Sequence, residues 1–82
     1  MEFLWTREAE RNLAELDRPV QERIAKKMRW FAAQADPLSF AETLTGSDGQ
    51  WRFRIGTYRI FVRPDGTVLA VLRIRKRSEA YR

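Results

Sequence analysis

Arginines alternate with large apolar residues through the middle of this sequence. The run from Trp51 to Arg63 reads Trp-Arg-Phe-Arg-Ile-Gly-Thr-Tyr-Arg-Ile-Phe-Val-Arg. A period of two predicts β-strands with one apolar face and one cationic face. The guanidinium group is a planar fork that binds phosphate through two parallel hydrogen bonds. The pattern therefore predicts a surface that binds phosphate groups.

The charge of the chain is concentrated in its C-terminal part. Residues 1–50 hold seven Lys and Arg against nine Asp and Glu, and residues 51–82 hold nine against two. This distribution predicts an anionic partner, although a cationic face that is merely solvated would give the same composition. The sequence contains no histidine and no cysteine. We therefore expect chemistry without a metal or another cofactor, since the commonest metal ligands and the commonest general acid are missing.

The length of 82 residues predicts a single domain over residues 1–82. No apolar run approaches the roughly 18 residues that a membrane span needs, and the N-terminus lacks the layout of a signal peptide. We expect a soluble, cytoplasmic protein that does not contact membranes.

The elements that must position the arginines can be placed along the chain. A short strand is expected at residues 2–5, and Thr6 is a suitable N-cap for a helix that ends before Asp17. A second helix is expected to start at Asp17-Arg18-Pro19, with Asp17 as the cap and Pro19 in the first turn, and to run to about Ala35. Residues 36–50 have the composition of turns. Strands are expected at 51–55, 58–63 and 68–75, and their short links make them antiparallel neighbours. The predicted fold class is α+β, with a two-helix hairpin on one face of a small antiparallel sheet of about four strands.

The opposite face of this sheet is expected to be open to solvent. If Trp51 and Phe53 point at the helices, the alternating arginines must point away from them. In the last strand, alternation groups Leu69, Val71, Arg73 and Arg75. We expect one exposed surface, with Phe61 as a platform for stacking, that carries the five arginines Arg52, Arg54, Arg59, Arg73 and Arg75.

Two short segments identify a family resemblance. The step Gly56-Thr57-Tyr58-Arg59 and the ending Arg77-Ser78-Glu79-Ala80-Tyr81 follow a helix pair, and in this order they resemble the RelE branch of the RelE/ParE superfamily of bacterial and archaeal toxins. The resemblance covers essentially the whole chain. It implies a toxin that is held inactive by an antitoxin and that, once released, enters the ribosomal A site and cuts mRNA. The family's reaction is metal-free: the ribose 2′-OH attacks the adjacent phosphate and leaves a 2′,3′-cyclic end.

The resemblance also implies roles for individual residues. The family's catalytic positions fall on Arg52, Arg54, Arg59, Arg75 and Tyr81. We expect Arg59 and Arg75 to stabilise the negative charge of the phosphorane. Phe61 or Tyr81 would stack on an unpaired base. The remaining basic residues expected to contact RNA are Arg73, Lys76 and Arg77.

One departure from the family pattern concerns the general base. RelE proteins commonly carry lysine at the positions of Arg52 and Arg54, and arginine cannot be deprotonated in a protein. Tyr81 is the remaining titratable candidate, and the charges of Arg75 and Arg77 would favour its ionised form. Alternatively, the ribosome supplies the proton transfer, or positioning and charge stabilisation suffice.

Two other functions are compatible with the same sequence. A ParE-like toxin would share the fold and block DNA gyrase without cutting RNA. A basic module without catalysis would bind RNA in a strongly salt-dependent way and release no product. Under both toxin hypotheses the expected partner is a cognate antitoxin that is acidic or that docks an apolar segment on the helix pair or the arginine surface.

Overall fold

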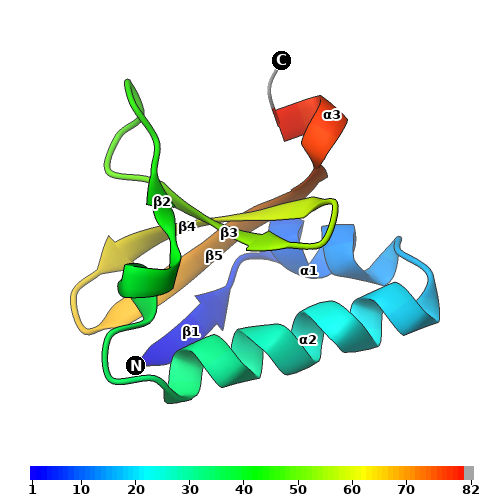
Figure 1. The fold of residues 1–82 in the computed structure, drawn as a ribbon, viewed down its shortest axis with the longest axis horizontal. Coiled ribbons are helices and arrows are strands. Elements are labelled where there is room, and N and C mark those ends of the chain that lie inside the picture. The colour runs from blue at the N-terminus through cyan, green and yellow to red at the C-terminus, as the bar shows by residue number, and fades with distance from the viewer. Residues whose placement is uncertain (81–82) are drawn as a thin grey trace.

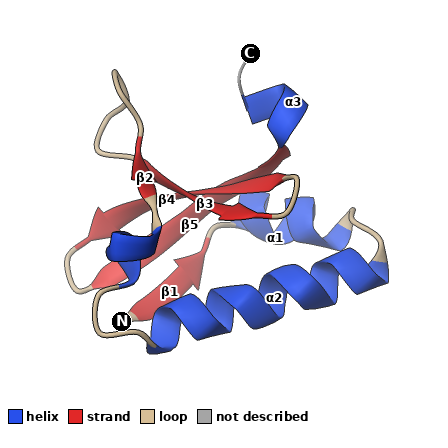
Figure 2. Cartoon of the chain, viewed as in Figure 1, coloured by secondary structure: helices blue, strands red, loops and turns tan. Residues whose placement is uncertain are grey.

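The computed structural model describes residues 1–80 as a sheet with the two longer helices on one side (Figure 1; Figure 2). The chain runs through β1 (Glu2–Trp5), α1 (Arg7–Ala14), α2 (Arg18–Ala33), a 3₁₀ turn (Pro37–Phe40), β2 (Glu42–Thr43), β3 (Trp51–Ile55), β4 (Tyr58–Asp65), β5 (Val68–Lys76) and α3 (Arg77–Ala80). The predicted α+β class is therefore confirmed. Among the described residues, no helix is both long and apolar enough to cross a membrane.

The sheet differs from the prediction in two respects. It has five strands in the order β1-β5-β4-β3-β2, because the two-residue strand β2 pairs with β3. It is also mixed rather than antiparallel, since β1 lies parallel to β5. A parallel neighbour requires a crossover connection, and the helix pair belongs to the connection that follows β1. The remaining neighbours are antiparallel, as predicted from their short links.

The core lies between the sheet and the helices α1 and α2. Within it, Phe31 from α2 stacks on Phe53 from β3, with ring centroids 4.3 Å apart. The other buried apolar residues on this helix side are Ala9, Ile24, Met28, Ile55, Ile60, Val62, Leu69, Val71 and Ile74. The face of the sheet that carries Phe53 and Ile60 is thus covered by helices.

A β-bulge in β5 decides which residues of that strand face the helices. Phe61 pairs with Arg73, but the next residue of β4, Val62, pairs with Val71, so that Leu72 is an extra residue in β5. A bulge of this kind shifts the alternation of the strand by one position. Val71 and Ile74 therefore both lie in the core, whereas Arg73 turns to the opposite face. The expectation that Leu69, Val71, Arg73 and Arg75 share a face is wrong for this reason.

Beyond the end of β1, the segment Thr6–Asn12 lies beside β5 and forms hydrogen bonds with its backbone. Thr6 caps the helix as predicted, because its hydroxyl oxygen accepts a hydrogen bond from the Ala9 N–H at 3.1 Å. The same hydroxyl donates to the carbonyl of Leu72 at 2.9 Å. Farther along, the Asn12 side-chain oxygen accepts from the Ile74 N–H at 2.9 Å. Side chains of the Thr6–Asn12 segment thus replace a neighbouring strand and fix the part of β5 that ends in Arg75.

Candidate functional site

Six side chains form two cross-strand rows on the face of the sheet that α1 and α2 leave uncovered. Arg54 pairs with Arg59, which pairs with Arg75, and Arg52 pairs with Phe61, which pairs with Arg73. Direct cross-strand partners lie on the same face of a sheet. We call this surface the arginine face; it consists of Arg52, Arg54, Arg59, Phe61, Arg73 and Arg75. In Figure 1 the β2–β3 connection and α3 rise at opposite ends of this side of the sheet.

Arg59 lies at the centre of the first row and is buried, not exposed as predicted. Its exposed fraction is 2%. Its Nη1 donates to the carbonyl oxygens of Gly56 and Tyr58, each at 3.0 Å. Its Nε is buried and has no hydrogen-bond partner within residues 1–80. A buried N–H donor without an acceptor is costly, and here it belongs to a cationic group beside two other arginines.

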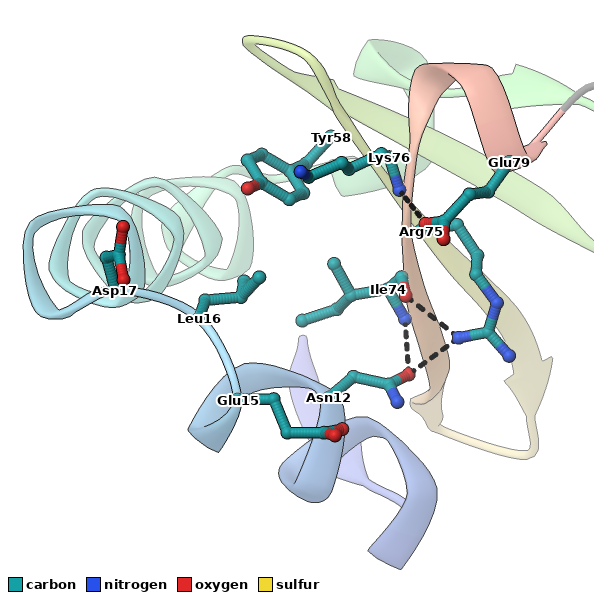
Figure 3. A pocket seen from close by; sticks show the side chains of 9 residues that line it. All are labelled: Asn12, Glu15, Leu16, Asp17, Tyr58, Ile74, Arg75, Lys76 and Glu79. Atoms are coloured by element: carbon teal, nitrogen blue, oxygen red, sulfur yellow. Dashed lines mark hydrogen bonds between the residues drawn. The ribbon is translucent and has the colours of Figure 1, made fainter.

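Arg75 is held at the side of the sheet by α1. Its Nη2 lies 2.9 Å from the Glu8 carboxylate, and its Nη1 donates to the Asn12 side chain at 3.0 Å and to the Ile74 carbonyl at 2.9 Å. Figure 3 shows Ile74 pointing toward Leu16 while Arg75 turns to the other side of β5. These contacts fix the guanidinium group before any ligand arrives.

Arg52 and Arg54 share one carboxylate, which the sequence prediction missed. Glu42 of β2 accepts from Arg52 Nη2 at 3.0 Å and lies 3.6 Å from Arg54 Nη1. The hydrogen bond from Arg52, together with the charges of Arg52, Arg54 and Arg59, lowers the pKa of Glu42. Glu42 went unnoticed because a two-residue strand gives no periodic signal, so that residues 36–50 were expected to form turns only.

Phe61 and Arg73 form a stacked pair in the second row. The guanidinium carbon of Arg73 lies 4.1 Å from the centroid of the Phe61 ring, and only 3% of Phe61 is exposed. Phe61 is therefore not the open stacking platform that was expected, because Arg73 covers it. Burial, and then the charge of Arg75, lower the pKa of Arg73. The surface presented here is the outer side of a guanidinium group supported by an aromatic ring.

The other predicted RNA-binding residues lie at the end of β5. Lys76 pairs with Tyr58, and both line a pocket of about 520 Å³ on the helix side of the sheet (Figure 3). Arg75 of the arginine face lines the same pocket, although Lys76 follows it on β5 and therefore points to the other face of the sheet. Arg77 is exposed and begins α3, where its N–H donates to the Thr57 carbonyl at 2.7 Å. Tyr81 lies outside the described residues. Within those residues, no three His, Cys, Asp or Glu side chains gather closely enough to hold a metal ion.

A profile of the family described as "ParE toxin of type II toxin-antitoxin system, parDE" matches residues 3–81. No match was found among curated protein sequences.

Three solved structures illustrate the likeness. A chain of the RelBE2 toxin–antitoxin complex from Mycobacterium tuberculosis is 25% identical, with a TM-score of 0.75 over 94% of this chain and 91% of that chain. A chain of the RelB–RelE complex from Methanococcus jannaschii is 18% identical, with a TM-score of 0.75 over 95% of this chain and 94% of that chain. A chain of the chromosomal ParDE system from P. aeruginosa is 19% identical, with a TM-score of 0.73 over 93% of this chain and 95% of that chain. The fold is common to RelE and ParE proteins, and the profile covers nearly the whole sequence. The chain therefore belongs to the ParE toxin family and is a type II toxin with the RelE/ParE fold.

Proposed function

We propose that this toxin is a ribosome-dependent endoribonuclease of the cytoplasm that cuts mRNA in the ribosomal A site. The observation that carries the proposal is the cross-strand row of Arg54, Arg59 and Arg75. Its central member is a buried guanidinium group whose Nε finds no acceptor within residues 1–80. A phosphate oxygen would supply that acceptor once the side chains that cover Arg59 move aside.

The reaction needs charge stabilisation more than it needs a metal. The 2′-oxygen of the ribose bonds to the adjacent phosphorus while the bond from phosphorus to the 5′-oxygen breaks. The 2′-OH loses a proton and the departing 5′-oxygen gains one, which leaves a 2′,3′-cyclic phosphate and a 5′-OH. The phosphorane carries additional negative charge between these events. Cations that are already fixed in place stabilise it more than they stabilise the substrate.

In this proposal each group of the arginine face has a role. Arg59, held by backbone carbonyls, and Arg75, held by Glu8 and Asn12, bind the reacting phosphate. Arg52 and Arg54 exchange the Glu42 carboxylate for phosphate oxygens. The Arg73–Phe61 pair stacks on an unpaired base, since RNA is commonly read in this way.

Residues at the C-terminal end of the chain are the candidates for the proton transfer and for the remaining RNA contacts. Tyr81 is the candidate general base, because arginine keeps its proton. Positioning of the 2′-OH in line with the departing oxygen, or a group of the ribosome, is the alternative source of this step. Exposed Arg77 and Lys76 would contact phosphates that flank the cleaved codon.

We further propose a cognate antitoxin as the partner that controls this activity. Support comes from solved structures with the same fold, which are described as toxin–antitoxin complexes. Two surfaces suit such a partner. An acidic segment would neutralise the arginine face, and an apolar segment would fill the pocket of about 320 Å³ between β1, α1 and α2, lined by Phe3, Trp5 and Met28 among others.

The test is a defined translation system that receives purified, antitoxin-free toxin. Mapping of mRNA ends should show cuts within A-site codons that bear cyclic phosphates. Arg75→Ala should lower the cleavage rate by roughly 10²–10³-fold, the usual cost of one donor to an anionic transition state. The control is Arg63→Ala, which removes the same charge from an arginine of β4 that pairs with Asp48 at 3.8 Å, outside both rows. Intact mRNA would refute the nuclease, and bound but uncut RNA would indicate a binding module.

A second candidate function, inhibition of DNA gyrase, is favoured by the match to the ParE family profile over residues 3–81. A gyrase supercoiling assay separates the two. If supercoiling is blocked by the wild-type toxin and equally by Arg75→Ala, while mRNA stays intact, gyrase is the target.

A further inference from the structure

A second cationic surface lies on the opposite side of the β3–β4 turn from the arginine face. Helix α2 contributes Arg23, Lys26, Lys27 and Trp30, which recur at the spacing of one helical face. The sheet contributes Arg54, Ile55 and Gly56, and together they line a depression of about 400 Å³. We call it the α2 groove.

The composition of the α2 groove fits an anion. Within the described chain, four of its seven lining residues are cationic and none is acidic. The pocket beside Tyr58 is different, because Glu15, Asp17 and Glu79 line it together with Arg75 and Lys76. The acidic residue of α2 nearest to the groove in sequence is Glu22. Its carboxylate lies 3.6 Å from the Nε of Arg18, which is one helical turn before it. Charge complementarity therefore favours a polyanion in the α2 groove rather than a neutral or basic ligand.

An aromatic side chain stands at one end of the groove. Trp30 remains 44% exposed, although it packs edge-on against Phe40 with ring centroids 5.1 Å apart. The ammonium group of Lys27 lies 4.4 Å from the Trp30 ring centroid. Lys27 is long and flexible, so it can move from the ring to a phosphate and leave the indole for a base. Cations next to a supported aromatic ring are the pattern of sites for single-stranded nucleic acid.

The α2 groove is continuous with the arginine face through two residues. Arg54, whose side chain is 65% exposed, lines the groove and also pairs with Glu42 on the arginine face. Gly56 accepts a hydrogen bond from Arg59 through its carbonyl, while the Arg23 guanidinium lies so close that a Cβ on Gly56 would be 3.1 Å from Arg23 Nη2. A strand bound on the arginine face and leaving past Arg54 would enter the α2 groove.

We propose that the α2 groove binds the continuation of the single-stranded mRNA whose reacting phosphate lies on the arginine face. This inference rests on the proposed nuclease function, because that function supplies the strand. The groove contributes no reacting group. It lengthens the footprint of the toxin on RNA beyond the cleaved codon and holds the strand by phosphate contacts and by stacking on Trp30.

The test measures binding of two RNAs of different length to the full chain. The probes are single-stranded oligoribonucleotides of about three and about twelve nucleotides, 2′-O-methylated so that they cannot be cut, followed by fluorescence anisotropy over a salt series. Wild-type toxin should bind the longer probe more tightly. Lys26→Ala/Lys27→Ala should weaken binding of the longer probe alone and reduce the slope of log K against log salt by about 1.4, that is, about 0.7 for each lost phosphate contact. Trp30→Ala should weaken it about tenfold through lost stacking.

The matched control removes two cations from the same helix outside the groove. Arg18 pairs with Glu22, and Arg29 lines the apolar pocket beside β1. If Arg18→Ala/Arg29→Ala weakens binding of the longer probe as much as the groove variant does, or if both probes bind the wild type equally, the proposal is wrong. Groove variants that bind both probes normally but lose the ribosome or the antitoxin would assign the groove to those partners and overturn it as well.

A cleavage assay separates this inference from the proposed function. If the wild type and the Lys26→Ala/Lys27→Ala variant cut mRNA equally well and bind the longer probe equally tightly, the role of the groove is refuted and the nuclease function stands. If the wild type cuts no mRNA but binds the longer probe more tightly than the groove variant does, the nuclease function is refuted and RNA binding by the groove stands.

Discussion

The two faces of the sheet are built from the same strands but are held together in different ways. On the helix face, Phe53, Ile60 and Val71 are buried by packing against the helices. On the arginine face, the rims are held by acceptors from outside the central strands: Glu42 of β2 on one side, and Glu8 and Asn12 of α1 on the other. The helix face is thus complete without a ligand. The arginine face keeps its cations in place with the chain's own carboxylates, which are groups that a phosphate can replace.

Arg59 does not follow this division. It belongs to the arginine face by its pairing with Arg54 and Arg75, yet it is as buried as a core residue. Its Nη1 is satisfied by backbone carbonyls, whereas Arg52 and Arg75 each also bind a side-chain carboxylate. A fixed central cation between adjustable neighbours is suited to binding the charge that develops during a reaction.

The largest effect is expected on the helix face. Phe53→Ala removes the ring between Phe3 and Phe31 and should lower the free energy of unfolding by about 3–5 kcal/mol. That is a large share of the stability of a domain of this size. Urea denaturation followed by circular dichroism measures it. Phe40→Ala, which truncates a ring that is half exposed, is the control and should cost less. Equal losses would show that the helix face is not the main source of stability.

Arg59 should combine both kinds of effect. Arg59→Ala leaves the carbonyls of Gly56 and Tyr58 without their donor and should cost about 1–3 kcal/mol in stability. It should also lower mRNA cleavage by roughly 10²–10³-fold. Arg54→Ala, at the exposed end of the same row, should reduce cleavage with almost no change in stability. Thermal unfolding and end-mapping on the same preparations check the pair. An Arg59 variant with wild-type stability would contradict a structural role for its burial.

The elements that repeat locally were predictable from the sequence. The period of two in residues 51–63 predicted β3, β4 and the common face of Arg52, Arg54 and Arg59, and the short links predicted antiparallel pairing. Helical spacing and the Thr6 cap predicted α1 and α2. These features depend on residues that are near one another in the chain.

The features that were missed depend on distant partners. The bulge at Leu72 is visible only when β5 is paired with β4, and without it Arg73 would point into the core. Strand β2 exists through its pairing with β3, and β1 joins β5 across most of the chain. The burial of Arg59 and the covering of Phe61 by Arg73 depend on how side chains fill the space between the rows. Residue alternation identifies a face but not how much of each residue on it is exposed.

The smallest effect concerns the rim of the arginine face, where the Glu42 carboxylate contacts Arg52 and Arg54. The pKa of Glu42 is lowered in the folded protein, chiefly by the hydrogen bond from Arg52. A carboxyl group of this kind contributes stability above its unfolded pKa and loses that contribution as the pH falls through its folded pKa. Glu42→Gln should therefore melt slightly below the wild type at pH 7, by a few degrees at most, and the difference should vanish in acid. Thermal melts over a pH series measure this.

The same substitution should act in the opposite direction on RNA. Glu42→Gln removes the carboxylate that competes with phosphate for Arg52 and Arg54, so the short RNA probe should bind more tightly at pH 7. Glu22→Gln, which breaks an exposed ion pair with Arg18 on α2, removes the same charge away from the arginine face and is the control. If both variants raise the affinity equally, only the net charge of the toxin matters. If Glu42→Gln alone does so, the carboxylate of Glu42 marks a phosphate position on a face that the chain itself keeps closed to anions until RNA displaces it.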